Sequence, residues 1–232
     1  MFRPFQILCE FIVLFLIVLV PRFACPQAEA QAPAQAVVTF TVDFPTSAPE
    51  HYSIRVQSDG SGLYQSSGRL SMDSDETDSF DLEFTVGAET RQKIFDLTAK
   101  AGYFKKDIDS HHKGLAFTGK KTLAYKDAQR SAESTYNYSL NPAVEALTSL
   151  MQDLSATLEF GHRLRYDLQY QKLALDDELK RMEELARTKE LVEVASIRPI
   201  LDQIIADQSV INVSRARAQR LLEHAGVQPI PR

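Results

Sequence analysis

The chain contains little cysteine. Its two cysteines are Cys9 and Cys25, and both lie within the first 30 residues. If those residues are removed during export, the remaining chain carries no thiol. This excludes a disulfide scaffold, a thiol nucleophile, a cysteine-ligated zinc site and an iron–sulfur cluster from the mature protein. Its stability must then come from a hydrophobic core, and a chain of roughly 200 residues is long enough to build one.

Signatures of several common functions are also missing. The formal net charge is −5 and no basic segment is clustered, so we expect no nucleic-acid partner. No GxSxG motif presents a serine nucleophile. The segment GLAFTGKKT, residues 114–122, begins like a phosphate-binding loop, but Lys121 stands where a hydroxyl is required. The residues after it alternate like a strand, so we expect no nucleotide partner and no cofactor.

Residues 1–30 have the features of a signal peptide. Arg3 supplies a positive charge, residues 11–20 are uniformly apolar, and residues 28–30 have the small-x-small pattern needed for cleavage. As a helix, the apolar segment covers only about 15 Å of a hydrocarbon core roughly 30 Å thick. The sequence therefore predicts a periplasmic or secreted protein. Membrane contact is expected only if the segment stays uncleaved as an N-terminal anchor.

Residues 31–36, rich in alanine, glutamine and proline, predict a disordered tether, and an α+β domain is expected over 37–160. Alternating apolar residues predict strands over 37–44, 51–57, 63–66 and 80–86, and a second hairpin over 121–140. Helical spacing predicts a helix over about 94–101, ended by Gly102. A second helix is predicted to begin at Asn141, as the cap, and Pro142. The fold class predicted is α+β, with an antiparallel sheet of hairpins and two helices packed on it.

Residues 161–232 predict an all-helical C-terminal extension. Leu164, Leu168, Leu175 and Leu179 fall within one narrow arc at 3.6 residues per turn. A restart of the helix at 175, with Asp176 as its cap, is one interpretation of this pattern. Two shorter helices are expected over 199–207 and 209–225. The packing of this extension on the α+β domain stays open at this point.

The stretch YSIRVQSDGSGLYQSS, residues 52–67, predicts a hairpin with its turn at Asp59-Gly60. Asp-Gly between alternating residues is a strong short-range hairpin signal. A two-residue turn pairs Val56 with Leu63, and a three-residue loop beginning at Asp59 pairs Val56 with Tyr64. Both registers are compatible with the sequence.

One segment has the residue types of a divalent metal site. Asp107, Asp109 and His111 are spaced two residues apart, which places them on one side of an extended chain, and His112 is adjacent. Carboxylate and imidazole groups bind zinc and related ions. These four residues are the candidate metal ligands, although neighbouring lysines oppose a cation and a solvated loop has the same pattern.

Three segments in order, YSIRVQSDGSGLY, RQKIFDLTAKAGYF and KKTLAYKD, resemble a type of uncharacterised exported bacterial protein. In that type a hairpin of pattern YS-x-x-V-x-x-DG-x-x-x-Y precedes a helix ending in AG-F/Y-F, and another hairpin follows. The resemblance covers about residues 50–158, and the later helical segments are similar to an extension that some members carry. It implies an α+β domain of unknown function and supplies no catalytic residue.

The sequence therefore favours a non-enzymatic binding or protein-interaction module of the cell envelope. Its partner would be an envelope protein, or a second copy through the helical extension. The alternative is a metal-assisted hydrolase that uses Asp107, Asp109, His111 and His112.

Overall fold

The computed structural model describes residues 35–45, 47–69 and 77–226. The expected signal peptide and most of the expected tether lie outside these residues. Six strands form one antiparallel sheet in the order β4-β3-β2-β1-β5-β6. The strands are β1 (Val37–Asp43), β2 (His51–Gln57), β3 (Ser61–Arg69), β4 (Thr77–Thr85), β5 (Lys120–Lys126) and β6 (Ser131–Tyr136). The helices are α1 (Ala88–Lys100), η1 (Gly102–Phe104), α2 (Pro142–Tyr170), α3 (Leu175–Thr188), η2 (Val194–Ile197), α4 (Arg198–Ala206) and α5 (Asn212–His224). The α+β fold class is confirmed.

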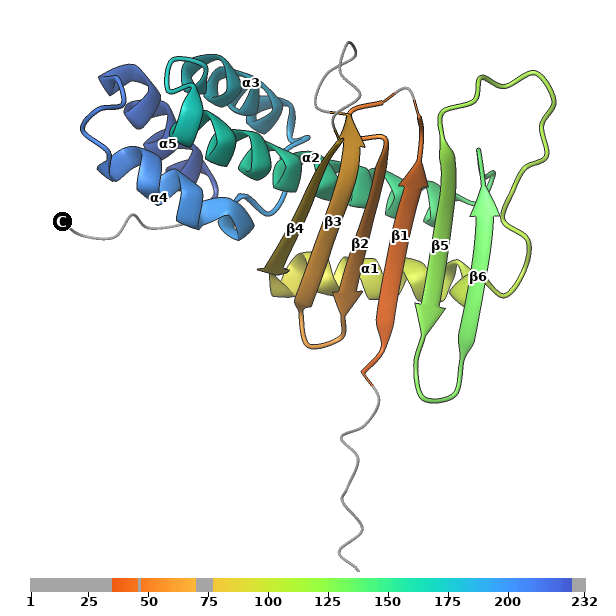
Figure 1. Cartoon of the computed structure of the whole chain (residues 1–232). Coiled ribbons are helices and arrows are strands. Elements are labelled where there is room, and N and C mark those ends of the chain that lie inside the picture. The colour runs from red at the N-terminus through yellow and green to blue at the C-terminus, as the bar shows by residue number, and fades with distance from the viewer. Residues whose placement is uncertain (1–34, 46, 70–76, 227–232) are drawn as a thin grey trace, which may run out of the picture. The chain divides into compact units, whose positions relative to one another are not determined.

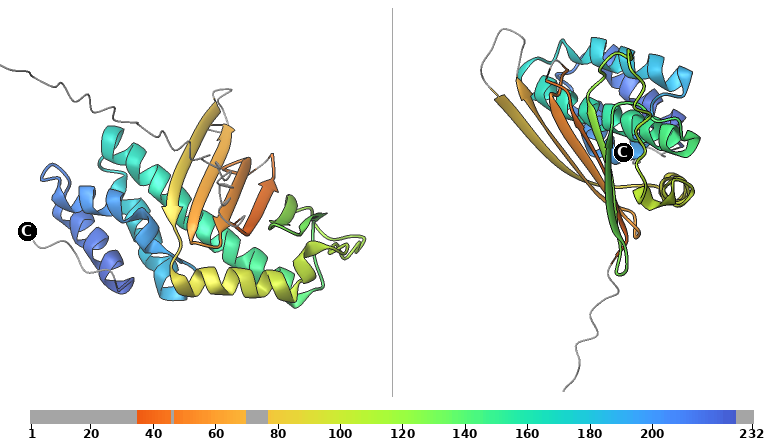
Figure 2. Two further views of the ribbon diagram at one scale, coloured as in Figure 1. Left: turned by 90° about the horizontal axis from the view of Figure 1, so that it is seen from below. Right: turned by 90° about the vertical axis from the view of Figure 1, so that its right-hand side faces the viewer.

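The two faces of the sheet differ in polarity, because successive side chains of a strand point to opposite sides. Val38, Phe40 and Val42 of β1 are buried, and the residues between them are only partly covered. Helices α1 and α2 cover the apolar face (Figure 1), and the side view shows all helices on that side of the sheet (Figure 2). The buried residues of strands and helices form one hydrophobic core.

The β2–β3 turn has a register that differs from both predicted ones. Val56 pairs with Gly62, so the loop consists of Ser58, Asp59 and Gly60. Gly60 has φ of +96°, which favours glycine, and the Asp59 carboxylate accepts a hydrogen bond from the Ser61 backbone N–H at 2.8 Å. Both predicted registers assumed that Val56 pairs with an apolar residue of β3, and this assumption was wrong.

The side chain that covers Gly62, the partner of Val56, comes from β4, which lies outside the β2–β3 hairpin. A Cβ placed on Gly62 would lie 2.5 Å from the ring of Phe84, so the ring occupies the space that a side chain would need. Phe84 is itself buried and pairs with Gly62 across the β3–β4 ladder. The Phe84 ring of β4 therefore requires a glycine at position 62. A prediction that considers only β2 and β3 cannot include this contact.

Helix α2 begins as predicted and ends later than the expected domain limit. The Asn141 side chain accepts a hydrogen bond from the Ala143 N–H at 3.0 Å, and Pro142 is the first helical residue. The helix continues to Tyr170, so residue 160 lies inside it. The described residues form one compact unit, and its core includes Leu158 and Leu164 on either side of that point. Helix α2 thus joins the sheet to the C-terminal helices without a linker.

The C-terminal helices pack on the second half of α2 (Figure 1). The predicted restart at 175 is confirmed, but the predicted cap is wrong, because Ala174 is the N-cap and makes no side-chain hydrogen bond. Asp176 instead pairs with Arg217 of α5 at 3.0 Å. Arg217 and Arg220 both bind Glu183 of α3. The C-terminal arginines therefore join α5 to α3.

Among the described residues, none of the helices combines the length and the apolar character needed to cross a membrane. The apolar segment of the expected signal peptide lies outside these residues.

Candidate functional site

The four predicted metal ligands lie in the loop between η1 and β5. The Asp107 carboxylate approaches His111 Nε2 at 2.6 Å, and this hydrogen bond raises the pKa of His111. Both Asp109 oxygens accept backbone hydrogen bonds, from His111 at 2.6 Å and from Asn137 at 2.9 Å. His112 is exposed and its backbone N–H donates to Ser110. The two carboxylates thus fix the loop to itself and to the segment after β6.

The metal prediction is tested by elemental analysis of the full chain purified without chelators. We expect zinc and other divalent metals well below one equivalent, because in the described part of the chain no three histidine, cysteine or acidic side chains are grouped to hold an ion. The control is the His111→Ala, His112→Ala double variant. Near-stoichiometric metal that this variant loses would establish the site and support the hydrolase alternative.

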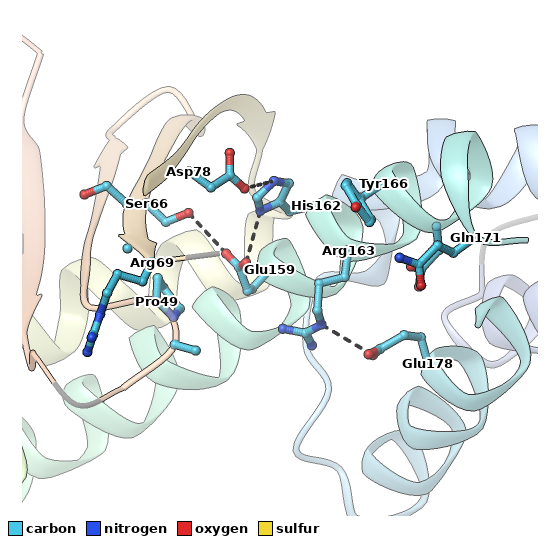
Figure 3. Close-up of a pocket in the computed structure, with 14 residues that line it drawn as sticks. Pro49, Ser66, Arg69, Asp78, Glu159, His162, Arg163, Tyr166, Gln171 and Glu178 are labelled. Carbon is cyan, nitrogen blue, oxygen red and sulfur yellow. Dashed lines mark hydrogen bonds and ion pairs between the residues drawn. The ribbon is translucent and has the colours of Figure 1, made fainter. Parts of the chain in front are cut away.

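A second group of polar residues lines a cavity of about 420 Å³ where the sheet meets the C-terminal helices. Its walls come from the segment after β1, the end of β3, the start of β4, the second half of α2 and α3 (Figure 3). The ionisable residues that line it are Arg69, Asp78, Glu159, His162, Arg163, Asp167 and Glu178. The late end of α2 and the restart at Leu175 create this site, because they carry the helix past the sheet and return α3 beside it.

Glu159 joins α2 to the sheet at one end of the cavity. One carboxylate oxygen accepts hydrogen bonds from the Tyr64 hydroxyl at 3.0 Å and the Ser66 hydroxyl at 3.2 Å. The other lies 3.1 Å from His162 Nδ1. Burial raises the pKa of Glu159, but the hydrogen bonds and charge of these partners outweigh burial and leave the pKa below its usual value. Glu159 is therefore held as a carboxylate.

His162 lies between two carboxylates. Its Nδ1 faces Glu159, and its Nε2 lies 3.1 Å from Asp78 of β4 (Figure 3). The imidazole is stacked on the Phe80 ring, with centroids 4.1 Å apart and planes at 6°. A protonated ring can donate to both carboxylates at once. The arrangement fixes the ring in position beside the cavity.

The wall of the cavity formed by α2 and α3 contains an imperfect ion pair. Arg163 Nε and Glu178 Oε2 are 3.4 Å apart, and both atoms are buried without a hydrogen-bond partner in the described part of the chain. The Arg163 guanidinium also lies over the Phe160 ring, 4.5 Å from its centroid. Asp167, one turn further along α2, is buried against the same wall. This wall therefore has hydrogen-bonding capacity that the described residues leave unused.

Sequence reasoning missed this site, although α2 carried a signal for it. Glu159, His162, Arg163, Tyr166 and Asp167 follow the spacing i, i+3, i+4, i+7, i+8, which places them on one side of a helix. A polar stripe that follows an apolar stripe along one helix indicates that the second part of the helix no longer packs on a purely apolar surface. The sequence does not reveal that β3, β4 and α3 complete the cavity.

Comparison with protein-family models and with curated protein sequences yields no match for this chain.

Proposed function

We propose that the protein is an exported, non-enzymatic binding protein of the cell envelope, and that a small polar ligand occupies the cavity beside α2. The observation that carries this proposal is the cavity of about 420 Å³ with polar groups converging on it from separate segments of the chain. Ligand sites are typically concave, about 300–1,000 Å³ in volume, and contain a few fixed polar groups.

The polar groups are held in place before a ligand arrives. Tyr64, Ser66 and His162 fix Glu159, and Asp78 with Phe80 fixes His162. Ordering side chains on binding costs about 0.5–1.5 kcal/mol for each flexible group. A wall ordered in advance avoids much of this cost, which supports a binding role.

The test is thermal unfolding of the mature chain against a panel of amino acids, amines, organic acids, sugars and nucleosides. We expect at least one compound to raise the midpoint saturably, because binding only to the folded state stabilises it. The Tyr166→Arg variant, which places a long cation in the cavity wall, should abolish the shift.

The matched control is Tyr170→Arg. The rings of Tyr170 and Tyr166 have centroids 5.0 Å apart, but Tyr170 does not line the cavity. This variant should therefore keep the ligand-dependent shift of the unfolding midpoint. A panel without any active compound, or a shift that survives in Tyr166→Arg, would contradict the proposal.

A further inference from the structure

The charges that line the cavity are unbalanced. Four carboxyl residues face it, against two arginines and one histidine. Arg69 is engaged outside the lining, because its Nε binds Glu50 at 2.7 Å. Arg163 is directed to Glu178. An anionic ligand would meet this acidic excess, whereas a cationic one would compensate it.

Asp167 is the least compensated of these carboxyls. The residue is only 8% exposed and lines the cavity, and in the described part of the chain its carboxyl has no hydrogen-bond or ion-pair partner. Burial raises its pKa, the charge of Glu178 raises it further, and Arg163 opposes both. Its oxygens are not among the fully buried polar atoms of the described residues, so they are open to the cavity, where the donor of a ligand can reach them.

Glu178 on the adjacent helix α3 is only partly compensated, because one of its oxygens, Oε1, lies 3.5 Å from Arg181 Nη1. Its Oε2 is buried and lacks a hydrogen bond, since the Arg163 Nε at 3.4 Å is not aligned to donate one. Asp167 of α2 and Glu178 of α3 both line the cavity, and both have acceptor positions without a hydrogen bond from the described residues. A hydrogen-bond donor would fill these positions, and a positive charge on it would offset the acidic excess of the lining.

We propose that this end of the cavity binds the primary ammonium group of a small organic molecule, with Asp167 and Glu178 as its acceptors. The inference rests on the proposed binding function and names its ligand class. An ammonium supplies three donors on one compact charge, which suits two carboxylates on neighbouring helices. Tyr166, 46% exposed at the cavity wall, offers an aromatic surface to the carbon chain of the ligand.

The experiment measures calorimetric binding of three probes of equal chain length to the mature chain: 1,5-diaminopentane, 1,5-pentanediol and glutarate. We expect saturable binding of the diamine, at least about tenfold tighter than the diol, and no binding of glutarate. Asp167→Asn should weaken diamine binding by about tenfold or more, and Glu178→Gln by several-fold. The matched control is Asp177→Asn, which removes the exposed carboxylate next to Glu178 on α3 and should leave binding unchanged.

Ligand-free stability supplies the second readout. Asp167→Asn keeps the shape of the side chain and removes a charge that lies near Glu178 and makes no hydrogen bond within the described part of the chain. The midpoint of thermal unfolding without ligand should therefore equal or exceed that of the parent chain. A clear loss of stability would assign Asp167 a structural role and overturn the inference, as would equal diamine binding by Asp167→Asn and the parent.

The two proposals fail in different ways. If the diol or glutarate binds as tightly as the diamine, and Tyr166→Arg abolishes that binding, the ammonium inference falls and the binding function stands. If neither these probes nor any compound of the wider panel binds, both fall.

Discussion

Replacing Gly161 with leucine is expected to lower the free energy of unfolding by about 3 kcal/mol, because it overfills a packed contact. Gly161 lies inside α2, and a Cβ placed on it would be 2.6 Å from Ile197 Cγ2 and 3.3 Å from Ile197 Cβ. Ile197 is buried in η2, just before α4. The glycine therefore lets the C-terminal helices approach the backbone of α2 at the point where the helix leaves the sheet.

Denaturant unfolding of a graded series measures this effect. Gly161→Ala should lower the free energy of unfolding by less than Gly161→Leu does. Alanine has a smaller side chain, and its helix propensity, about 1 kcal/mol better than that of glycine, offsets part of the clash. In the Ile197→Ala background the clash is relieved, so Gly161→Ala should become neutral or stabilising there. The control is Gln169→Leu on the exposed side of the same helix, which should change stability by less than about 0.5 kcal/mol. Equal costs for Gly161→Leu and Gln169→Leu would contradict the close approach.

Local patterns predicted the elements of this fold well. The alternation in β1 and the spacing of Ile94 and Thr98 in α1 reflect a single buried side of each element, which a short window records. The start of α2 was predictable for the same reason, because Asn141 caps it through an atom two residues away. These features depend on residues that are neighbours in the sequence, so the sequence alone is enough to predict them.

Features decided by distant residues were not predictable in this way. The β2–β3 register depends on the Phe84 ring over Gly62. The helical pattern past residue 160 was predicted, but the packing of the C-terminal helices on α2 depends on residues far apart in the chain. The cavity is the extreme case. Glu159 meets Tyr64 and Ser66, which precede it by 95 and 93 residues. The stripe on α2 indicates polarity on one side of the helix, but not the groups opposite it.

Glu159→Ala is expected to lower the free energy of unfolding by about 3 kcal/mol at pH 7, because removing one member of a buried, hydrogen-bonded group leaves its partners uncompensated. The side chain is 14% exposed and accepts hydrogen bonds from Tyr64 and Ser66 while it pairs with His162. Tyr64 is fully buried, so its hydroxyl would lose its only hydrogen-bond acceptor among the described residues.

The pH dependence of this loss follows from the lowered pKa of Glu159. A carboxyl whose pKa is lower in the folded than in the unfolded state stabilises the fold at pH values above its unfolded-state pKa, which is about 4.5 here. This contribution is lost as the pH falls through the folded-state pKa. The difference between parent and Glu159→Ala should therefore be largest near pH 7 and shrink below about pH 4. Denaturant unfolding across this range measures it.

Tyr64→Phe provides the matched background, since it removes the hydroxyl that Glu159 accepts from and keeps the buried ring. Glu159→Ala should cost less in Tyr64→Phe than in the parent chain, because no buried hydroxyl is then left without an acceptor. A full cost in both backgrounds, or a difference that stays constant down to pH 3, would show that the carboxylate contributes only through packing. In that case Glu159 would not be the charged anchor that fixes this wall of the cavity.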